Sequence, residues 1–305
     1  MQILMVTAGM GIGGAETYIL TLCKELAERG ETLTVVSSGG IYVKALRRAG
    51  IRHRNLPLNR HDPVSFGRAL RGLFAEITRI RRETGEDPVL HAHGRYPAFV
   101  CGLAARQTGL RMLTGAHGIY KKTPLLRRLT NWGERTLAVS CDIKQELIEQ
   151  YGYPADGITR TVNGVDCRRF SPESGGALPE GCRPECTERI LYVSRLDRDC
   201  MRAGEVLLEI LPALLNRFPG LELLIVGDGD GRSALEQRAR EIHAAAGRSA
   251  VIFTGARGDV ERILPHGTVF VGVSRAALEA MAAGLPVILA GAQGYLGIFS
   301  PETPE

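Results

Sequence analysis

The chain has 305 residues, of which 44% are hydrophobic and 23% are charged. At roughly 150 residues per domain, this length suggests about two domains, each able to bury its own core. The composition excludes a disordered chain, a collagen-like chain and a coiled coil. No apolar stretch reaches the ~18 residues of a membrane span, and the seven cysteines are odd in number and scattered. We therefore expect a cytoplasmic protein without a disulfide framework.

The net charge of +5 is unevenly divided along the chain. Residues 1–170 carry 25 Lys and Arg against 15 Asp and Glu, whereas residues 171–305 carry 13 against 18. A basic half can attract nucleic acid, anionic lipid or a phosphorylated ligand, or it can be a solvated surface. We expect no nucleic acid partner, because no nucleic-acid-binding motif is present. In the segment from Lys121 to Trp132, cations alternate with apolar and aromatic residues, which favours contact with an anionic membrane surface.

Short β-branched apolar runs alternate with helical periods through the first half of the chain. Strands are predicted at Gln2–Thr7, Thr32–Ser37, Val89–Ala92, Met112–Ala116 and Thr136–Val139, and helices at Gly14–Arg29, Val64–Glu83, Pro97–Thr108 and Cys141–Tyr151. This alternation predicts a mostly parallel sheet covered on both faces, a Rossmann-like domain whose ligands bind at the carboxyl ends of the strands.

A second series of the same kind follows. Strands are predicted at Arg189–Val193, Leu221–Val226, Ala250–Phe253, Val269–Val273 and Pro286–Leu289, and helices at Arg202–Arg217, Arg232–Ala244 and Ala276–Ala283. Between the two series, residues 171–188 are rich in Pro, Gly and Glu, which indicates a linker. The predicted organisation is thus a first Rossmann-like domain at 1–170 and a second at 189–305.

A glycine-rich loop lies between the first predicted strand and the first predicted helix. Residues 9–16, Gly-Met-Gly-Ile-Gly-Gly-Ala-Glu, match the dinucleotide pattern G-x-G-x-x-G. Binding of NAD also needs an acidic residue at the end of the second strand, where residues 37–40 are Ser-Ser-Gly-Gly. A nicotinamide cofactor is therefore disfavoured, although NADP does not require the acid. The loop is either an anion-binding loop, with backbone amides facing a phosphate, or a tight turn.

Two further patterns could be taken for metal sites. Asp228 and Asp230 have a spacing that could hold a divalent cation against a diphosphate, but they lie in a Gly-rich turn before a helix, where Asp and Gly are common structural residues. Cys182 and Cys186 have no second Cys or His pair near them in sequence, so zinc is disfavoured. We predict no metal.

A set of motifs, in order over residues 3–288, resembles the retaining glycosyltransferases of family four, which have the two-domain GT-B fold. These motifs are Gly13-Gly14-Ala15-Glu16, His91-Ala92-His93-Gly94, Ala138-Val139-Ser140, Val162-Asn163-Gly164-Val165-Asp166 with Phe170, Val193-Ser194-Arg195-Leu196-Asp197, Ile225-Val226-Gly227-Asp228-Gly229, Phe253-Thr254-Gly255 and Leu278-Glu279-Ala280-Met281-Ala282-Ala283-Gly284-Leu285-Pro286-Val287-Ile288.

The resemblance implies an α/β fold with two Rossmann-like domains facing a cleft. It implies transfer of a sugar, with retention and without a metal or further cofactor, from a nucleotide diphosphate sugar to a bacterial envelope polysaccharide or lipid-linked acceptor. Two other functions remain open: a nucleotide-sugar 2-epimerase, which shares this fold, and a non-catalytic nucleotide-sugar binder.

The resemblance also implies roles for individual residues. His93 would lie near the donor sugar and the acceptor, and the guanidinium of Arg195 would stabilise the departing diphosphate unless it only forms a surface ion pair. The carboxylate of Glu279 would accept hydrogen bonds from the ribose hydroxyls, in a helix capped by Ser274. The substrate-binding residues are Gly13, Gly14, His117, Ser274, Arg275, Ala276 and Glu279.

The chain departs from the family pattern at three places. Val271 stands where a Glu usually contacts the donor sugar, and Cys200 stands where a Lys is frequent, with Arg202 as a substitute nearby. After Ile288 the chain runs only to Glu305, so we expect a second domain shortened at its C-terminus.

Overall fold

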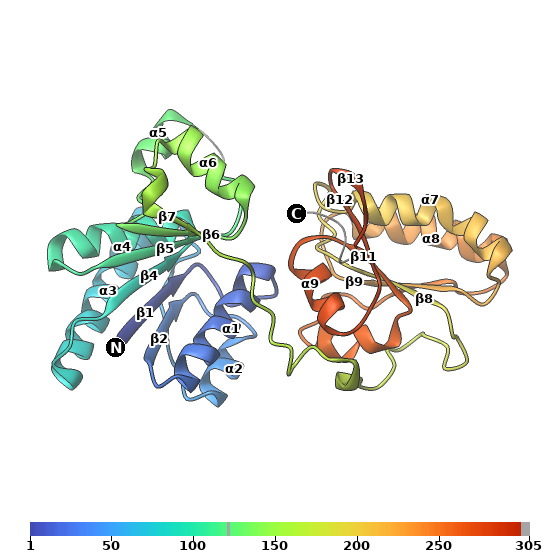
Figure 1. Cartoon of the computed structure of the whole chain (residues 1–305), viewed down its shortest axis with the longest axis horizontal. Helices are drawn as coiled ribbons and strands as arrows, with labels where there is room; N and C mark the ends of the chain where they lie inside the picture. Colours follow the sequence, from blue (N-terminus) through green and yellow to red (C-terminus); the bar gives the residue numbers. More distant parts are fainter. Residues whose placement is uncertain (121–122, 300–305) are drawn as a thin grey trace. The chain divides into compact units, whose positions relative to one another are not determined.

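The computed structural model describes residues 1–120 and 123–299. The chain forms two compact units, Met1–Gly164 and Val165–Glu305 (Figure 1). Each unit contains one sheet built mainly from parallel strands, with helices on both faces. This confirms the prediction of two Rossmann-like α/β domains.

In the first unit the sheet has the strand order β3-β2-β1-β4-β5-β6-β7, and all its described pairs are parallel. The strands are β1 Gln2–Thr7, β2 Thr32–Ser37, β3 Arg52–Asn55, β4 Val89–His93, β5 Met112–Ala116, β6 Arg135–Ala138 and β7 Ile158–Arg160; the helices are α1 Gly14–Glu28, α2 Val43–Arg48, α3 Pro63–Thr84, α4 Arg95–Thr108, α5 Pro124–Leu129, α6 Cys141–Tyr151 and the 3₁₀ turn η1 Ala155–Gly157. The order places β4 and β5 side by side near the middle of the sheet.

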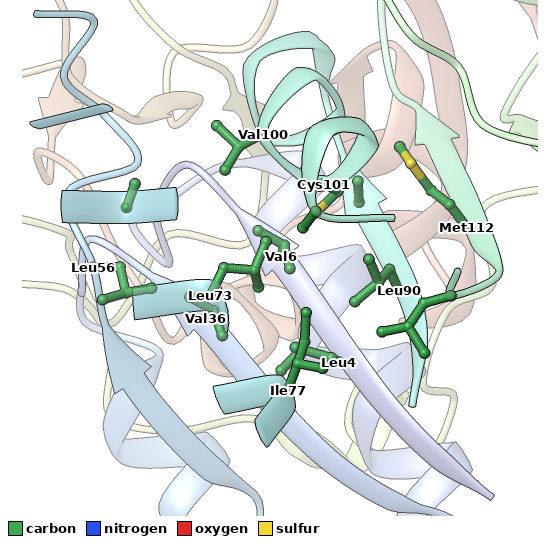
Figure 2. Packing of buried hydrophobic residues seen from close by; sticks show 14 of the residues in the cluster. Leu4, Val6, Val36, Leu56, Leu73, Ile77, Leu90, Val100, Cys101 and Met112 are labelled. Atoms are coloured by element: carbon green, nitrogen blue, oxygen red, sulfur yellow. The ribbon is translucent and has the colours of Figure 1, made fainter. Parts of the chain in front are cut away.

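The side chains of β1 explain how this sheet is covered. Successive residues of a strand point to opposite faces, and Leu4 and Val6 pack into a cluster with residues of α3 and α4 (Figure 2). Ile3 and Met5 pack into a second cluster with residues of α1 and α2. Both faces of the sheet are therefore buried, as expected for parallel strands.

In the second unit the strand order is β10-β9-β8-β11-β12-β13, and only the β12–β13 pair is antiparallel among the described pairs. The strands are β8 Arg189–Val193, β9 Glu222–Val226, β10 Val251–Phe253, β11 Val269–Gly272, β12 Val287–Gly291 and β13 Gly294–Ile298; the helices are α7 Arg202–Arg217, α8 Arg232–Ala246, α9 Ser274–Ala282 and the 3₁₀ turns η2 Pro172–Ser174, η3 Val260–Arg262 and η4 Leu264–His266. Residues of α7 and α8 pack on one face of the sheet, and residues of α9 pack on the other.

The boundary between the units lies a few residues earlier than predicted. Residues 165–170 belong to the second unit, because Phe170 is buried in its core and Arg169 binds Glu261 with a nitrogen–oxygen distance of 2.8 Å. The predicted linker also packs on this unit, since the backbone amide of Gly176 donates to the carbonyl of Arg262 at 3.1 Å.

Candidate functional site

Three histidines gather at the carboxyl ends of β4 and β5 in the first unit. His93 is the last residue of β4 and His117 directly follows β5. Because these strands are neighbours, the two predicted histidines meet: Nδ1 of His93 lies 2.9 Å from Nε2 of His117. His91 lies two residues before His93 on the same strand, and the centroids of their rings are 4.2 Å apart. The structure thus adds His91, a residue of the same motif to which the sequence assigned no role.

Burial favours the uncharged form of His91 and of His93. Burial lowers the pKa of His91 to about 3 and lowers the pKa of His93 well below its usual value, and neighbouring histidines lower both further. The side chain of His93 is 4% exposed, and its Nε2 lies 3.4 Å from Sδ of Met5. Both ring nitrogens of His93 therefore contact protein atoms. His117 is only half-buried.

Gly115 makes room for the two histidines. It pairs with His93 across the sheet, and a Cβ at position 115 would lie 2.7 Å from Nδ1 of His93 and 3.0 Å from Nε2 of His117. These distances are shorter than ordinary van der Waals contacts. A larger residue at position 115 would therefore push the rings apart.

We expect Gly115→Ala to disrupt the histidine pair and to destabilise the fold by about 1–3 kcal/mol, the usual cost of overpacking a core. Gly118→Ala is the matched control, because a Cβ there meets nothing within 4 Å. Thermal unfolding should show a lower Tm for the first variant and a Tm near that of the parent for the second. Equal Tm values for the two variants would contradict this account of Gly115.

The glycine loop before α1 is braced by the loop that follows β2. The backbone amide of Met10 donates to the carbonyl of Gly39 at 2.8 Å, and Gly40 adopts a φ of +138° where its backbone meets that of Met10. Gly13 is the N-cap of α1, and its carbonyl accepts from the backbone amide and the hydroxyl of Thr17 at 3.0 and 2.8 Å. A structural turn explains these contacts, and the amides of the first helical turn still leave a partial positive charge there.

In the second unit, α9 carries a buried ion pair. Nε of Arg275 donates to Oε1 of Glu279 at 2.9 Å, one turn further along the helix, and both side chains are buried. Burial raises the pKa of Glu279, while the charges of Arg275 and Arg169 oppose this shift. Two of the predicted substrate-binding residues are thus brought together, and each fixes the other's orientation.

A second ion pair acts on the same carboxylate. Arg169 binds Glu261 and donates to the carbonyl of Gly258 at 3.0 Å. Both members of this pair influence the pKa of Glu279, Arg169 lowering it and Glu261 raising it. No local sequence pattern predicts this pair, because 92 residues separate its two members.

Ser274 is the first residue of α9 and not its cap. The N-cap position is Val273, without a side-chain cap, and Ser274 has a φ of 60°. The prediction that Ser274 caps the helix is wrong, because a cap residue needs an extended backbone. Among the described residues other than glycine, only Ser274 has a positive φ. Such strain costs roughly 1–2 kcal/mol and is frequent at binding sites. Ala276 is half-buried and packs against the core of the second unit.

Arg195 lies just beyond the carboxyl end of β8. Its side chain is 65% exposed, and Nη1 lies 3.1 Å from Oδ2 of Asp197. Nη2 lies 3.3 Å from Sγ of Cys200, the residue at the position where the family often has Lys. An exposed ion pair of this kind stabilises the fold by about 1 kcal/mol at most. Asp197 therefore orients Arg195 only weakly, and the guanidinium can turn toward an anion.

The remaining candidates have structural roles. Val271 lies in β11 and packs in the core, where it is 5% exposed. Oδ2 of Asp228 binds Arg232 at 3.3 Å, and Oδ1 of Asp230 accepts from the backbone amide of Arg198 at 3.0 Å. These aspartates hold the loop before α8, although neither caps the helix. Across residues 1–120 and 123–299, no cluster of three or more His, Cys, Asp or Glu side chains is arranged to hold a metal ion.

The segment predicted to meet a membrane differs from the expectation in one respect. Trp132 is 3% exposed and packs against the rings of Tyr120 and Tyr151, so its indole cannot reach lipid. Lys121 and Lys122 lie outside the described residues. Helix α5 begins after Thr123, whose hydroxyl accepts from the amide of Leu126 at 3.2 Å. In the part of the chain that the structure describes, no helix has the length and apolar character needed to cross a bilayer.

Comparison with known proteins agrees with this architecture. The chain is 26% identical over 298 residues to the phosphatidyl-myo-inositol mannosyltransferase of Mycobacterium leprae, covering 90% of this chain and 74% of that protein. A glycosyltransferase from Rickettsia africae shares the fold with a TM-score of 0.72 and 22% identity, over 95% of this chain and 79% of that one. Anabaena Alr3699/HepE, solved with UDP-glucose, gives a TM-score of 0.71 and 18% identity, over 95% of this chain and 80% of that one.

Two family models together match most of the sequence. Residues 12–169 match Glycosyltransferase Family 4, and residues 187–300 match Glycosyl transferases group 1. The first model alone spans more than half of the 305 residues. The chain therefore belongs to Glycosyltransferase Family 4, and the protein is a glycosyltransferase with the GT-B fold.

Proposed function

We propose that the enzyme transfers a hexosyl group from a nucleotide diphosphate sugar to a carbohydrate or lipid-linked acceptor of the bacterial envelope. In this reaction the bond between the anomeric carbon and the diphosphate oxygen breaks, and a bond from that carbon to an acceptor hydroxyl oxygen forms on the same face of the sugar. The hydroxyl proton leaves with the departing diphosphate, and no metal takes part.

The observation that carries the donor assignment is the fixed carboxylate of Glu279. An ionised carboxylate is an acceptor-only group, suited to the two adjacent hydroxyls of a ribose. Nε of Arg275 donates to Oε1 of this carboxylate at 2.9 Å. The Glu279 side chain is therefore already ordered, and it loses little further conformational entropy when a ligand binds. The solved structures of Anabaena Alr3699/HepE, which hold UDP and UDP-glucose, support a nucleotide sugar as donor.

The proposed reaction also needs a positively charged group beside the leaving diphosphate. Negative charge grows on the diphosphate as the glycosidic bond breaks, and without a metal it needs fixed cations or amides. We assign this role to Arg195, assisted by the backbone amides of Ser274, Arg275 and Ala276 at the start of α9. Gly13 and Gly14 at the start of α1 are the second phosphate-binding feature that we propose.

The donor assignment predicts a ligand-dependent gain in stability. A panel of UDP-, GDP-, ADP- and TDP-sugars should contain at least one that raises the Tm, because a ligand at 100 times its Kd stabilises the native state by about 2.7 kcal/mol. EDTA should leave this shift unchanged, since Asp228 and Asp230 are bound to protein groups. No shift with any nucleotide sugar, or a shift that needs added Mg²⁺, would contradict the proposal.

The acceptor proposal rests on the charge of the first half and on the relatives. The mannosyltransferase of Mycobacterium leprae is named for a phosphatidyl-inositol lipid, and residues 1–170 of this chain carry an excess of 10 positive charges. We propose that the enzyme works at the inner face of the membrane.

The enzyme should then float with vesicles that contain anionic lipid and be released at 0.5 M salt, which screens such attraction beyond roughly one Debye length. Equal recovery with neutral and anionic vesicles would overturn this part of the proposal.

A further inference from the structure

A buried serine at the carboxyl end of β2 contacts a histidine of the neighbouring strand β3. Ser37 is the last residue of β2 and is 0% exposed. Its Oγ lies 2.8 Å from Nε2 of His53, which is in β3. The backbone amide of Gly39 donates to the same Oγ at 3.1 Å. The Ser37 hydroxyl therefore joins the neighbouring strand to the loop that follows β2.

The loop after β2 in turn holds the glycine loop that precedes α1. The carbonyl of Gly39 accepts from the backbone amide of Met10 at 2.8 Å, and the backbone amide of Tyr42 donates to the carbonyl of Met10 at 3.0 Å. Gly39 has a φ of +90°, a conformation that glycine adopts without strain. A continuous chain of contacts thus runs from the His53 ring through the Ser37 hydroxyl to the backbone of Met10 in the glycine loop.

The single hydrogen of the Ser37 hydroxyl decides the direction of its contact with His53. A hydroxyl carries one hydrogen and two acceptor lone pairs, and the amide of Gly39 takes one of these lone pairs because it can only donate. Among the described residues, the ring of His53 offers the one other polar atom within hydrogen-bond distance of this hydroxyl. A hydroxyl hydrogen without an acceptor is costly at a position that is 0% exposed. Ser37 therefore donates to Nε2 of His53, and the hydrogen of the neutral ring lies on Nδ1.

Protonation of His53 would remove this acceptor, because an imidazolium carries a hydrogen on both nitrogens. Burial lowers the pKa of His53 below its usual value, and the charge of Arg47 in α2 lowers it further. The neighbouring Arg52 and Arg54 of β3 pair with glutamates of α3, and β2 contributes no charged side chain. The neutral ring is therefore the main form at neutral pH, and it is lost as the pH falls through the lowered pKa.

We propose that His53 and Ser37 are positioning residues that hold the glycine loop so that the amides at the start of α1 face a phosphate of the donor, and that protonation of His53 releases this hold. The phosphate rests on the proposed function, whereas the hold on the loop does not. Neither side chain would touch the phosphate, because both act through the backbone of the loop. The arrangement of the glycine loop, and with it the use of the donor, should therefore depend on pH.

Hydrogen exchange on the full chain without any ligand tests the hold on the loop. In Ser37→Ala the amide of Gly39 loses its acceptor, so the amides of Gly39 and Met10 should exchange roughly 2- to 10-fold faster than in the parent at neutral pH, the effect of one hydrogen bond. Ser140→Ala is the control, because it removes a serine hydroxyl that accepts a backbone amide in α6 instead, and it should leave both amides unchanged. Unchanged exchange of both amides in a folded Ser37→Ala variant would overturn the proposal.

The pH dependence of kcat/KM for the donor then tests the consequence for activity. His53→Gln keeps an acceptor oxygen that does not titrate, whereas His53→Leu removes the acceptor at every pH. We expect the kcat/KM of the parent to fall, relative to that of His53→Gln, as the pH drops through the pKa of His53. At neutral pH, His53→Leu should have a kcat/KM roughly 2- to 10-fold below that of the parent. His61→Gln, at an exposed histidine beside Tyr96, is the control and should keep the pH profile of the parent.

Circular dichroism should show that these variants fold. If folded His53→Leu has the kcat/KM of the parent at every pH, the positioning role is overturned. If the parent turns over no donor, the proposed function is overturned instead, and hydrogen exchange still decides whether Ser37 and His53 hold the loop.

Discussion

Replacing Arg195 by alanine should lower kcat about 100-fold or more while changing donor affinity less. A preorganised charge contact to a developing oxyanion contributes about 3 kcal/mol in the transition state. The side chain lies beyond the end of β8 and is 65% exposed, so its loss should not disturb the core. Steady-state kinetics with saturating donor measure kcat, and a titration with the nucleoside diphosphate measures affinity.

A surface ion pair on α8 supplies the control for this variant. Arg238 pairs with Glu241, and both side chains are exposed. Arg238→Ala should have the kcat of the parent, because exposed pairs contribute little to stability and this one belongs to neither proposed binding feature. If Arg195→Ala turns over like the parent while EDTA stops the reaction, a bound metal ion rather than Arg195 stabilises the negative charge of the diphosphate. Asp228 and Asp230 are then the first residues to replace.

Replacing Glu279 by glutamine should act mainly on binding of the donor. Hydrogen bonds to a charged group contribute about 1.5–3 kcal/mol, which corresponds to a roughly 10- to 100-fold rise in KM. The ribose is held alike in the ground state and the transition state, so this loss should leave kcat within a few-fold of the parent. Glu241→Gln is the matched control on the exposed pair of α8.

The same variant tests the ion pair in α9. Glutamine keeps the size of the side chain but leaves the charge of Arg275 without its carboxylate, and Arg275 is 5% exposed. Breaking a buried pair from one side costs about 3–5 kcal/mol, so Glu279→Gln should also unfold at a lower temperature. Thermal unfolding separates this loss of stability from the loss of affinity. Unchanged nucleotide affinity in a folded Glu279→Gln variant would contradict its role at the ribose.

The fold follows from the sequence wherever apolar runs alternate with helical periods. The predicted bounds of β1, β2, β5, β8 and α7 agree with the structure at both ends. The strand β3 was missed because Arg52–Asn55 is entirely polar, and pairing with β2 rather than its own side chains makes it a strand. The strand β13 was missed because two glycines interrupt Gly294–Ile298, which is antiparallel to β12.

The site was predictable in its residue types and less so in its contacts. The carboxyl ends of neighbouring parallel strands placed His93 and His117 together, as strand order requires. Which ring is buried depends on Tyr18 and Met5, whose packing no local pattern reveals. The membrane interpretation of Trp132 failed for the same reason, since an indole in a run of cations can equally fill a core.

Product analysis with a donor that stabilises the protein tests the central claim most directly. The enzyme would be incubated with that nucleotide diphosphate sugar and a panel of carbohydrate and lipid-linked acceptors in the presence of EDTA, and the products followed by NMR. We predict a glycosylated acceptor with the anomeric configuration of the donor, together with one equivalent of nucleoside diphosphate. An epimerised donor without transfer would identify a 2-epimerase, and a bound donor that never turns over would identify a non-catalytic binder; either result would contradict the proposed function.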